Sequence, residues 1–98
     1  MKITTEAQHI TAVAKTKIAK VTTDIDKAEE RAKQLVPEAE QSESVKKTLK
    51  AMLGGIDSAQ KIRRGLTTIV KTLQYVEPTA FVELNDNECL LLSYVDLD

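Results

Sequence analysis

The sequence contains few aromatic residues, glycines and prolines. Its 98 residues include one Phe, two Tyr and no Trp, with three Gly and two Pro, although 42% of the chain is apolar. Any core must therefore be built mainly from aliphatic side chains, and a chain of this length supports only one core. The scarcity of turn-forming residues disfavours a β-sandwich. The composition indicates a small, mainly helical protein.

Side chains that carry out chemistry are also scarce. The chain has one Cys, Cys89, and one His, His9, so it cannot assemble a Cys/His zinc cluster or a Cys–His nucleophile pair with a further orienting His. Two pairs of acids, at residues 24/26 and 29/30, lack the spacing and the glycine of a calcium-binding loop, so we expect them on solvated helix faces. No glycine-rich phosphate loop occurs. We therefore predict no catalytic, cofactor-binding or metal-binding residues and no enzymatic activity.

Long apolar runs are absent too. The first ten residues contain no apolar run of about 7 to 15 residues, so we expect no Sec-type signal peptide. The longest apolar cluster, near residues 89–95, is much shorter than the roughly 20 residues of a membrane-spanning helix. A single cysteine can form no internal disulfide, which is consistent with a reducing compartment. We expect a cytoplasmic protein that does not insert into a membrane.

The charges are distributed unevenly along the chain. Residues 1–76 carry 14 basic and 9 acidic side chains, whereas residues 77–98 carry 6 acidic side chains and no basic one. The chain therefore divides into a basic segment, 1–76, and an acidic, apolar C-terminal tail, 77–98. Such a tail either lies back on the basic segment or remains available to a basic surface of a partner.

Apolar residues recur at intervals of three or four in two long series, from Ile3 to Leu35 and from Val45 to Val76. The mean interval of about 3.6 residues is the period of an α-helix, so each series forms one face of a helix. Each helix should be roughly 48 Å long. The short polar connection allows only an antiparallel return, so the predicted fold class is all-α, an antiparallel two-helix hairpin shaped as a rod.

Capping residues and prolines indicate where the two helices begin and end. Thr5 and Gln8 have the spacing of a capping box at the start of the first helix. Ser42 or Ser44 can cap the start of the second. The residue before a proline disfavours the α conformation, so Pro37 and Pro78 mark the C-terminal ends. The resulting prediction is helices at about 5–36 and 44–76.

The apolar faces are wider than the contact between two helices requires. Secondary apolar positions such as Val13, Leu53 and Val70 flank the main series, so the hairpin should associate with a second hairpin, from another protein or from a second copy. Gly54 and Gly55 form a tolerated kink, let a partner helix approach, or remain from a turn. The expected partner interface consists of large side chains of both series: Ile10, Ile18, Val21, Ile25, Leu49, Met52, Ile56, Ile62, Leu66, Ile69 and Leu73.

The tail beyond Pro78 contains two β-prone runs separated by the polar residues 85–88. This pattern favours a small β-hairpin formed by residues 79–84 and 89–97, although the first run could instead prolong the second helix. An isolated two-stranded ribbon is not stable in water. The tail should therefore pack on the hairpin or on a partner.

A chain of about 100 residues that forms a helical hairpin with a short tail resembles the small ESX or WXG-type proteins of type VII secretion. It is most similar to the α-helical partners of LXG toxins that lack Trp, since the Trp-x-Gly motif is absent here. In ESX-type pairs a Tyr-x-x-x-Asp motif after the second helix is part of the export signal, and Tyr94 and Asp98 have this spacing. The LXG partners have a Phe-x-x-x-Asp version, which Phe81 and Asn85 match except for the final Asn.

The resemblance implies a non-enzymatic accessory protein that binds the helical N-terminal region of an LXG-type toxin and contributes to an export signal. Tyr94 with Asp98, or Phe81 with Asn85, would be the export-signal residues, and the protein would leave the cytoplasm through type VII secretion. The apolar faces of the two helices would form the interface with the toxin.

Two other functions fit the residues themselves. A self-associating structural or regulatory coiled-coil protein, encoded by a phage or a mobile element, would use the same apolar faces to form a homo-oligomer. A nucleic-acid-binding module would use the second helix, which carries seven Lys or Arg and one acid between residues 46 and 71. The near-neutral chain, with no aromatic residue on the basic face, makes nucleic-acid binding the least favoured of the three.

Overall fold

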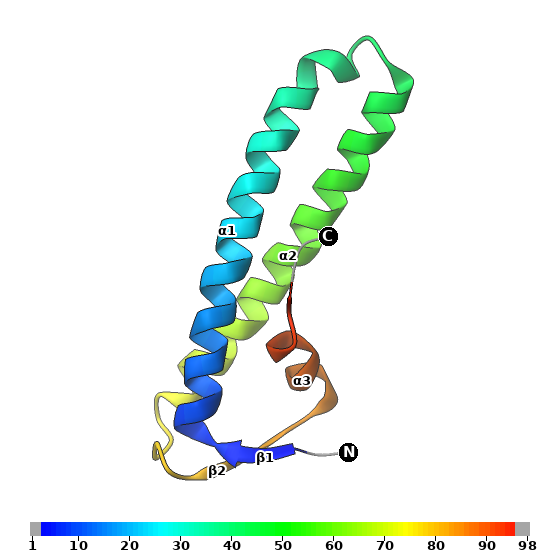
Figure 1. Cartoon of the computed structure of the whole chain (residues 1–98). Coiled ribbons are helices and arrows are strands. Elements are labelled where there is room, and N and C mark those ends of the chain that lie inside the picture. Colours follow the sequence, from blue (N-terminus) through cyan, green and yellow to red (C-terminus); the bar gives the residue numbers. More distant parts are fainter. Residues whose placement is uncertain (1–2, 96–98) are drawn as a thin grey trace.

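The computed structural model describes residues 3–95. Two long helices, α1 (Ala7–Ala39) and α2 (Glu43–Leu73), lie antiparallel and side by side (Figure 1). They form a rod with extents of 56 × 24 × 16 Å. The predicted helical hairpin is confirmed. No helix within residues 3–95 is long and apolar enough to cross a membrane.

Helix α1 differs from the prediction at both ends. It begins at Ala7 because the preceding residues form a short strand, β1 (Ile3–Glu6). The N-cap is Glu6, which makes no side-chain capping bond, so the capping box expected from Thr5 and Gln8 does not form. The helix also continues past Pro37. A proline lacks the N–H that would donate a helical hydrogen bond, and the helix ends two residues later, at Ala39.

Helix α2 begins as predicted and ends earlier. The Ser42 hydroxyl accepts a hydrogen bond from the Val45 backbone N–H at 3.4 Å, which confirms one of the two predicted caps. The helix ends at Leu73 and not near residue 76, because the Val76 N–H donates to the Leu73 carbonyl at 3.0 Å and closes a turn. This turn directs the chain back toward the start of α1.

The first β-prone run of the tail forms strand β2 (Phe81–Leu84), which pairs antiparallel with β1. In this register Ile3 is opposite Leu84 and Glu6 is opposite Phe81. The prediction of a β-hairpin within the tail is therefore wrong, since the partner strand comes from the other end of the chain. The pairing fastens the tail to the first turn of α1, where the Ala7 N–H donates to the Ala80 carbonyl at 2.9 Å.

The second β-prone run is helical, α3 (Asp86–Leu92), and not a strand. A capping box begins this helix: the Glu88 N–H donates to Asn85 Oδ1 at 2.7 Å, and the Asn85 N–H donates to Glu88 Oε1 at 3.0 Å. Two backbone donors that would otherwise lack partners are thereby satisfied. The polar residues 85–88, predicted to separate two strands, are the N-cap and first turn of a helix.

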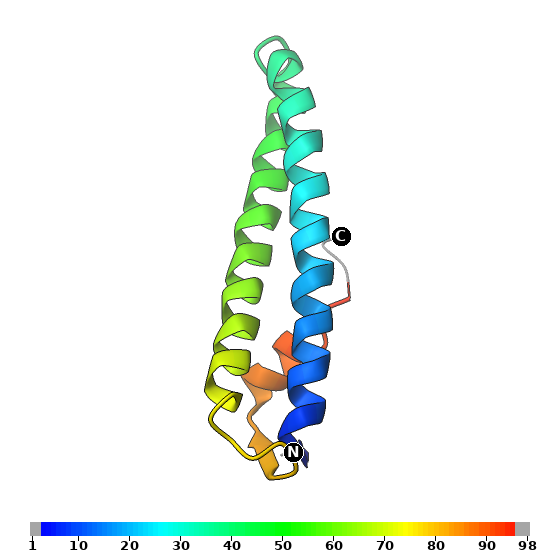
Figure 2. The ribbon, with the colours of Figure 1, turned by 90° about the vertical axis from the view of Figure 1, so that its left-hand side faces the viewer.

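The hairpin and the tail share their core. One apolar cluster, near the sheet, joins Leu66 of α2 to Ala14 of α1 and Leu84 of β2, with Leu91 of α3 packed against it. A second cluster, further along the rod, includes Tyr94 from the end of the tail. Figures 1 and 2 both show the tail, as far as Val95, beside the half of the rod near the sheet, whereas none of the described tail residues covers the half near the α1–α2 connection. Of the two alternatives for the tail, the structure shows that it lies back on the basic segment.

Candidate protein-interaction site

Tyr94, the first residue of one export-signal candidate, is buried. It is 8% exposed, and its hydroxyl donates a hydrogen bond to Asp24 Oδ2 at 2.6 Å. Lys17 Nζ donates to the Tyr94 carbonyl oxygen at 2.5 Å. Asp98, the other residue of this motif, lies outside the described residues. The side chain of Tyr94 therefore holds the tail against α1 and is not presented at the surface.

The acceptor for Tyr94 is a buried carboxylate. Asp24 is 7% exposed, and its other oxygen, Oδ1, lies 2.9 Å from Lys20 Nζ. A buried carboxylate is costly unless charge and hydrogen bonds compensate it, and here the ammonium group and the phenol do so. The expectation that residue 24 lies on a solvated face is wrong. Asp24 lies between the apolar positions Val21 and Ile25, and this location was the signal that it borders the core.

A glycine in α2 allows α3 to approach closely. A Cβ atom placed on Gly65 would lie 2.7 Å from Leu91 Cδ1, which is shorter than a normal contact. Gly54 and Gly55 have no atom within 4 Å of the corresponding position, and both lie inside a continuous helix. The close helix approach considered for these two glycines therefore occurs at Gly65, and its partner is this chain's own tail.

This packing predicts different effects on stability for two Gly-to-Ala substitutions. Gly54→Ala should raise the free energy of unfolding by about 0.5–1 kcal/mol, because Ala is the better helix former and space is open. Gly65→Ala should gain about 1 kcal/mol less, because Leu91 must move away from the new methyl group. Urea unfolding measures both, and equal gains would show that Leu91 does not pack at Gly65.

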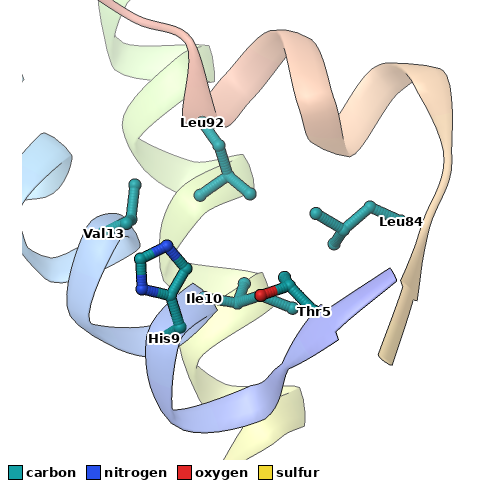
Figure 3. Close-up of a pocket in the computed structure, with 6 residues that line it drawn as sticks. All are labelled: Thr5, His9, Ile10, Val13, Leu84 and Leu92. Atoms are coloured by element: carbon teal, nitrogen blue, oxygen red, sulfur yellow. The ribbon is translucent and has the colours of Figure 1, made fainter. Parts of the chain in front are cut away.

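A small apolar hollow of about 250 Å³ lies where α1, the sheet and the end of α3 meet (Figure 3). Figure 3 shows Leu84 and Leu92 pointing into it from the tail and Val13 and His9 bordering it from α1. Besides His9, its lining holds one hydroxyl, that of Thr5, and no acid that could orient the imidazole, so a nucleophile–base–acid arrangement is not present there. Among residues 3–95, no three His, Cys, Asp or Glu side chains lie close enough to hold a metal ion.

Most side chains of the expected partner interface pack inside the chain. Seven of the eleven are buried: Ile10, Val21, Ile25, Ile56, Leu66, Ile69 and Leu73. Four are half-buried: Ile18, Leu49, Met52 and Ile62. The contact between α1 and α2, together with the tail, uses most of both apolar faces. A partner surface must therefore be sought among the apolar side chains that remain exposed.

The large apolar side chains of α1 and α2 that remain exposed lie in the half of the rod that the tail does not cover. Val36 is 48% exposed and Leu53 is 52% exposed. Leu49, one turn before Leu53, borders a hollow of about 380 Å³ together with Val36 and Lys46. We call Val36, Leu49 and Leu53 the distal patch. Lys46 and the exposed Lys50 adjoin it on α2.

The second export-signal candidate is divided between two roles. Phe81 is 71% exposed at the start of β2 and is accessible to another protein. Asn85 uses its side chain to cap α3 through the bond to the Glu88 N–H. A protein that recognises Phe81 and Asn85 together would therefore have to contact a residue that already serves as a helix cap.

The molecule is a two-helix rod whose tail is folded back on one half. No family model, curated protein or solved structure matches this chain. The surfaces from which a function can be argued are therefore those described above, the distal patch and the C-terminal residues that pack on α1 and α2.

Proposed function

We propose that this protein is a non-enzymatic accessory partner in type VII secretion that binds the helical N-terminal region of an LXG-type toxin and contributes to its export signal. The resemblance of the hairpin, its length and the Tyr94/Asp98 spacing to the helical partners of such toxins support the proposal. The observation that carries the binding role is the distal patch, an apolar surface of α1 and α2 that no other element of residues 3–95 covers.

Burial of the distal patch explains why a partner helix would bind there. Complete burial of a Val or Leu side chain contributes about 1.5–3 kcal/mol. Val36 and Leu53 are about half exposed, so burial by a partner would contribute about half of this free energy at each residue. The two side chains alone would support only weak binding. A helix lying along the rod would extend the contact to Leu49 and Met52, which are half-buried.

The charge around the distal patch indicates what the partner should carry. Glu40 and Glu43 line the hollow at the α1–α2 connection, so this end of the distal patch carries both signs of charge. On the α2 side, toward Leu53, the exposed side chains of Lys46, Lys47 and Lys50 prevail, and Asp57 is the one acid of α2 beyond its first turn. A partner helix with acidic residues beside its apolar face would pair with these lysines, which favours fast association and correct orientation. We therefore expect an amphipathic, acid-flanked helix in the toxin.

The test is binding to the N-terminal region of an LXG-type toxin encoded beside this protein. Leu53→Asp should weaken the complex at least about tenfold, because it places a charge in the centre of the apolar contact. Ala51→Asp is the matched control, since Ala51 is exposed on the same turn of α2 but outside the distal patch. Isothermal titration calorimetry with purified proteins measures both.

Two outcomes would contradict the proposed function. No complex between the wild-type protein and the toxin region would remove its basis. Equal binding by the Leu53→Asp and wild-type proteins would remove the distal patch as the interface. A wild-type homodimer that Leu53→Asp dissociates would instead favour the self-associating coiled-coil function, and sedimentation of the protein alone detects it.

A further inference from the structure

The last described part of the tail, residues 86–95, packs on the two apolar clusters of the hairpin through Cys89, Leu91, Leu92 and Tyr94. Leu91 packs at Gly65, the Tyr94 hydroxyl bonds Asp24, and Lys17 bonds the Tyr94 carbonyl. No residue of α3 is fully buried, and Leu90 and Val95 are 71% and 72% exposed. A helix of seven residues is not stable by itself. The segment therefore depends on its contacts with α1 and α2.

The proposed export signal conflicts with this arrangement. Tyr94 would have to be contacted by another protein, yet it is among the most buried residues of the tail and its hydroxyl already has an acceptor. A reader cannot reach a phenol that lies between α1 and the core. Recognition of Tyr94 therefore requires the segment to leave the hairpin.

We propose that residues 86–95 form a releasable strap, which hides Tyr94 when it is closed on Gly65 and Asp24 and exposes it when it opens. This inference rests on the proposed function, because it describes how the export signal of that function is controlled. A reader that binds only the open form has its apparent affinity lowered by the fraction of molecules that are closed. The strap thus limits recognition of an isolated protein.

The composition of the contacts explains how the strap could open while the hairpin stays folded. Opening removes the half-buried Leu91 and Leu92 and the buried Tyr94 from their contacts, but it restores the backbone freedom of ten residues. Tyr94 and Leu91 leave the two apolar clusters on opening, but side chains of α1 and α2 such as Val21 and Leu66 still pack within them. Local opening should therefore cost less free energy than global unfolding.

Hydrogen exchange of the full chain, followed by NMR, tests the proposal. The Ser93 and Tyr94 amides donate backbone hydrogen bonds within the strap, at 3.1 and 3.3 Å, and the Cys89 amide donates to the Asn85 carbonyl just before the strap, at 3.0 Å. We expect their protection factors to be roughly 100-fold smaller than that of the Leu66 amide in α2, because they exchange through local opening. Tyr94→Phe should lower strap protection roughly 10- to 100-fold further, because it removes a hydrogen bond to a carboxylate, and should leave Leu66 unchanged.

Tyr75→Phe is the matched control, because Tyr75 is 86% exposed and lies outside the strap. It should leave all protection factors unchanged. Equal protection of the strap and of Leu66 would overturn the proposal, since the strap would then open only when the whole hairpin unfolds. An unchanged strap in Tyr94→Phe would overturn it as well.

The proposed function can fail separately from the strap. If the strap opens locally but a Tyr94→Ala variant is exported normally, the export role is contradicted and the proposal of a releasable strap still holds. Lost export of Tyr94→Ala, combined with a strap that exchanges only by global unfolding, would contradict the strap and leave the export role intact.

Discussion

Replacing Leu66 by Ala is expected to lower the free energy of unfolding by about 2–5 kcal/mol. Leu66 is 0% exposed and lies in the cluster that joins α1, α2 and β2, so truncation leaves a cavity where three elements meet. A small domain has about 5–15 kcal/mol of stability in total, so the variant should lose a large part of it. Urea unfolding followed by circular dichroism measures the loss.

Leu53→Ala is the control for Leu66→Ala, because it deletes the same atoms at a site that is 52% exposed. Its cost should stay below about 1 kcal/mol, since much of the side chain is already in water. Similar costs for the two variants would contradict the assignment of Leu66 to the core. Leu66 also cannot report on a partner interface, because its substitution alters the hairpin itself.

Replacing Tyr94 by Ala is expected to open the strap in most molecules. Truncation of a buried aromatic residue costs about 3–5 kcal/mol, which corresponds to a shift of the strap equilibrium of roughly 100-fold or more. Most buried side chains of the cluster that contains Tyr94 belong to α1 and α2, so the free-energy loss should first favour local opening of the strap. Chymotrypsin should then cleave within residues 89–92 while α1 and α2 remain resistant, and mass spectrometry identifies the products.

Tyr75→Ala provides the comparison for Tyr94→Ala. Tyr75 is 86% exposed, so its truncation should leave the rate of cleavage within the strap unchanged. A strap that resists chymotrypsin equally in the Tyr94→Ala and Tyr75→Ala variants would show that Tyr94 does not hold it closed.

The helical hairpin could be predicted because its signal is local and repeated. Apolar residues recur with the α-helical period over about 32 residues in each helix, and a single exception such as Pro37 cannot disturb a series of that length. Ser42 is a preferred N-cap residue in front of the second series and was recognised as such. These features depend only on neighbouring residues.

The second β-prone run of the tail was predicted wrongly because two local signals compete there. Residues 89–92 are β-prone by composition, but Asn85 and Glu88 have the spacing of a capping box that begins a helix. The strand partner of Phe81–Leu84 is Ile3–Glu6, and the prediction of a helix at about 5–36 had assigned the second half of this strand to that helix. A pairing between the two ends of the chain leaves no pattern in either segment alone.

The contacts that hold the strap could not be predicted for the same reason. Tyr94 and Asp24 are 70 residues apart, and neither residue type indicates the other. The contact between Gly65 and Leu91 could not be predicted because one glycine in a helix does not reveal which element approaches it. Periodicity also shows which face of a helix is apolar but not what covers it, so residues expected at a partner interface are packed within this chain.

The most direct test of the account is a double-mutant cycle between Tyr94→Phe and Asp24→Ala, with the free energy of strap opening measured by hydrogen exchange. If the Tyr94 hydroxyl donates to the Asp24 carboxylate in solution, we expect a coupling energy of about 1.5–3 kcal/mol, which is typical of a hydrogen bond to a charged group. A coupling energy of zero would contradict the account, because the two side chains would then not interact and Tyr94 would not be held on α1.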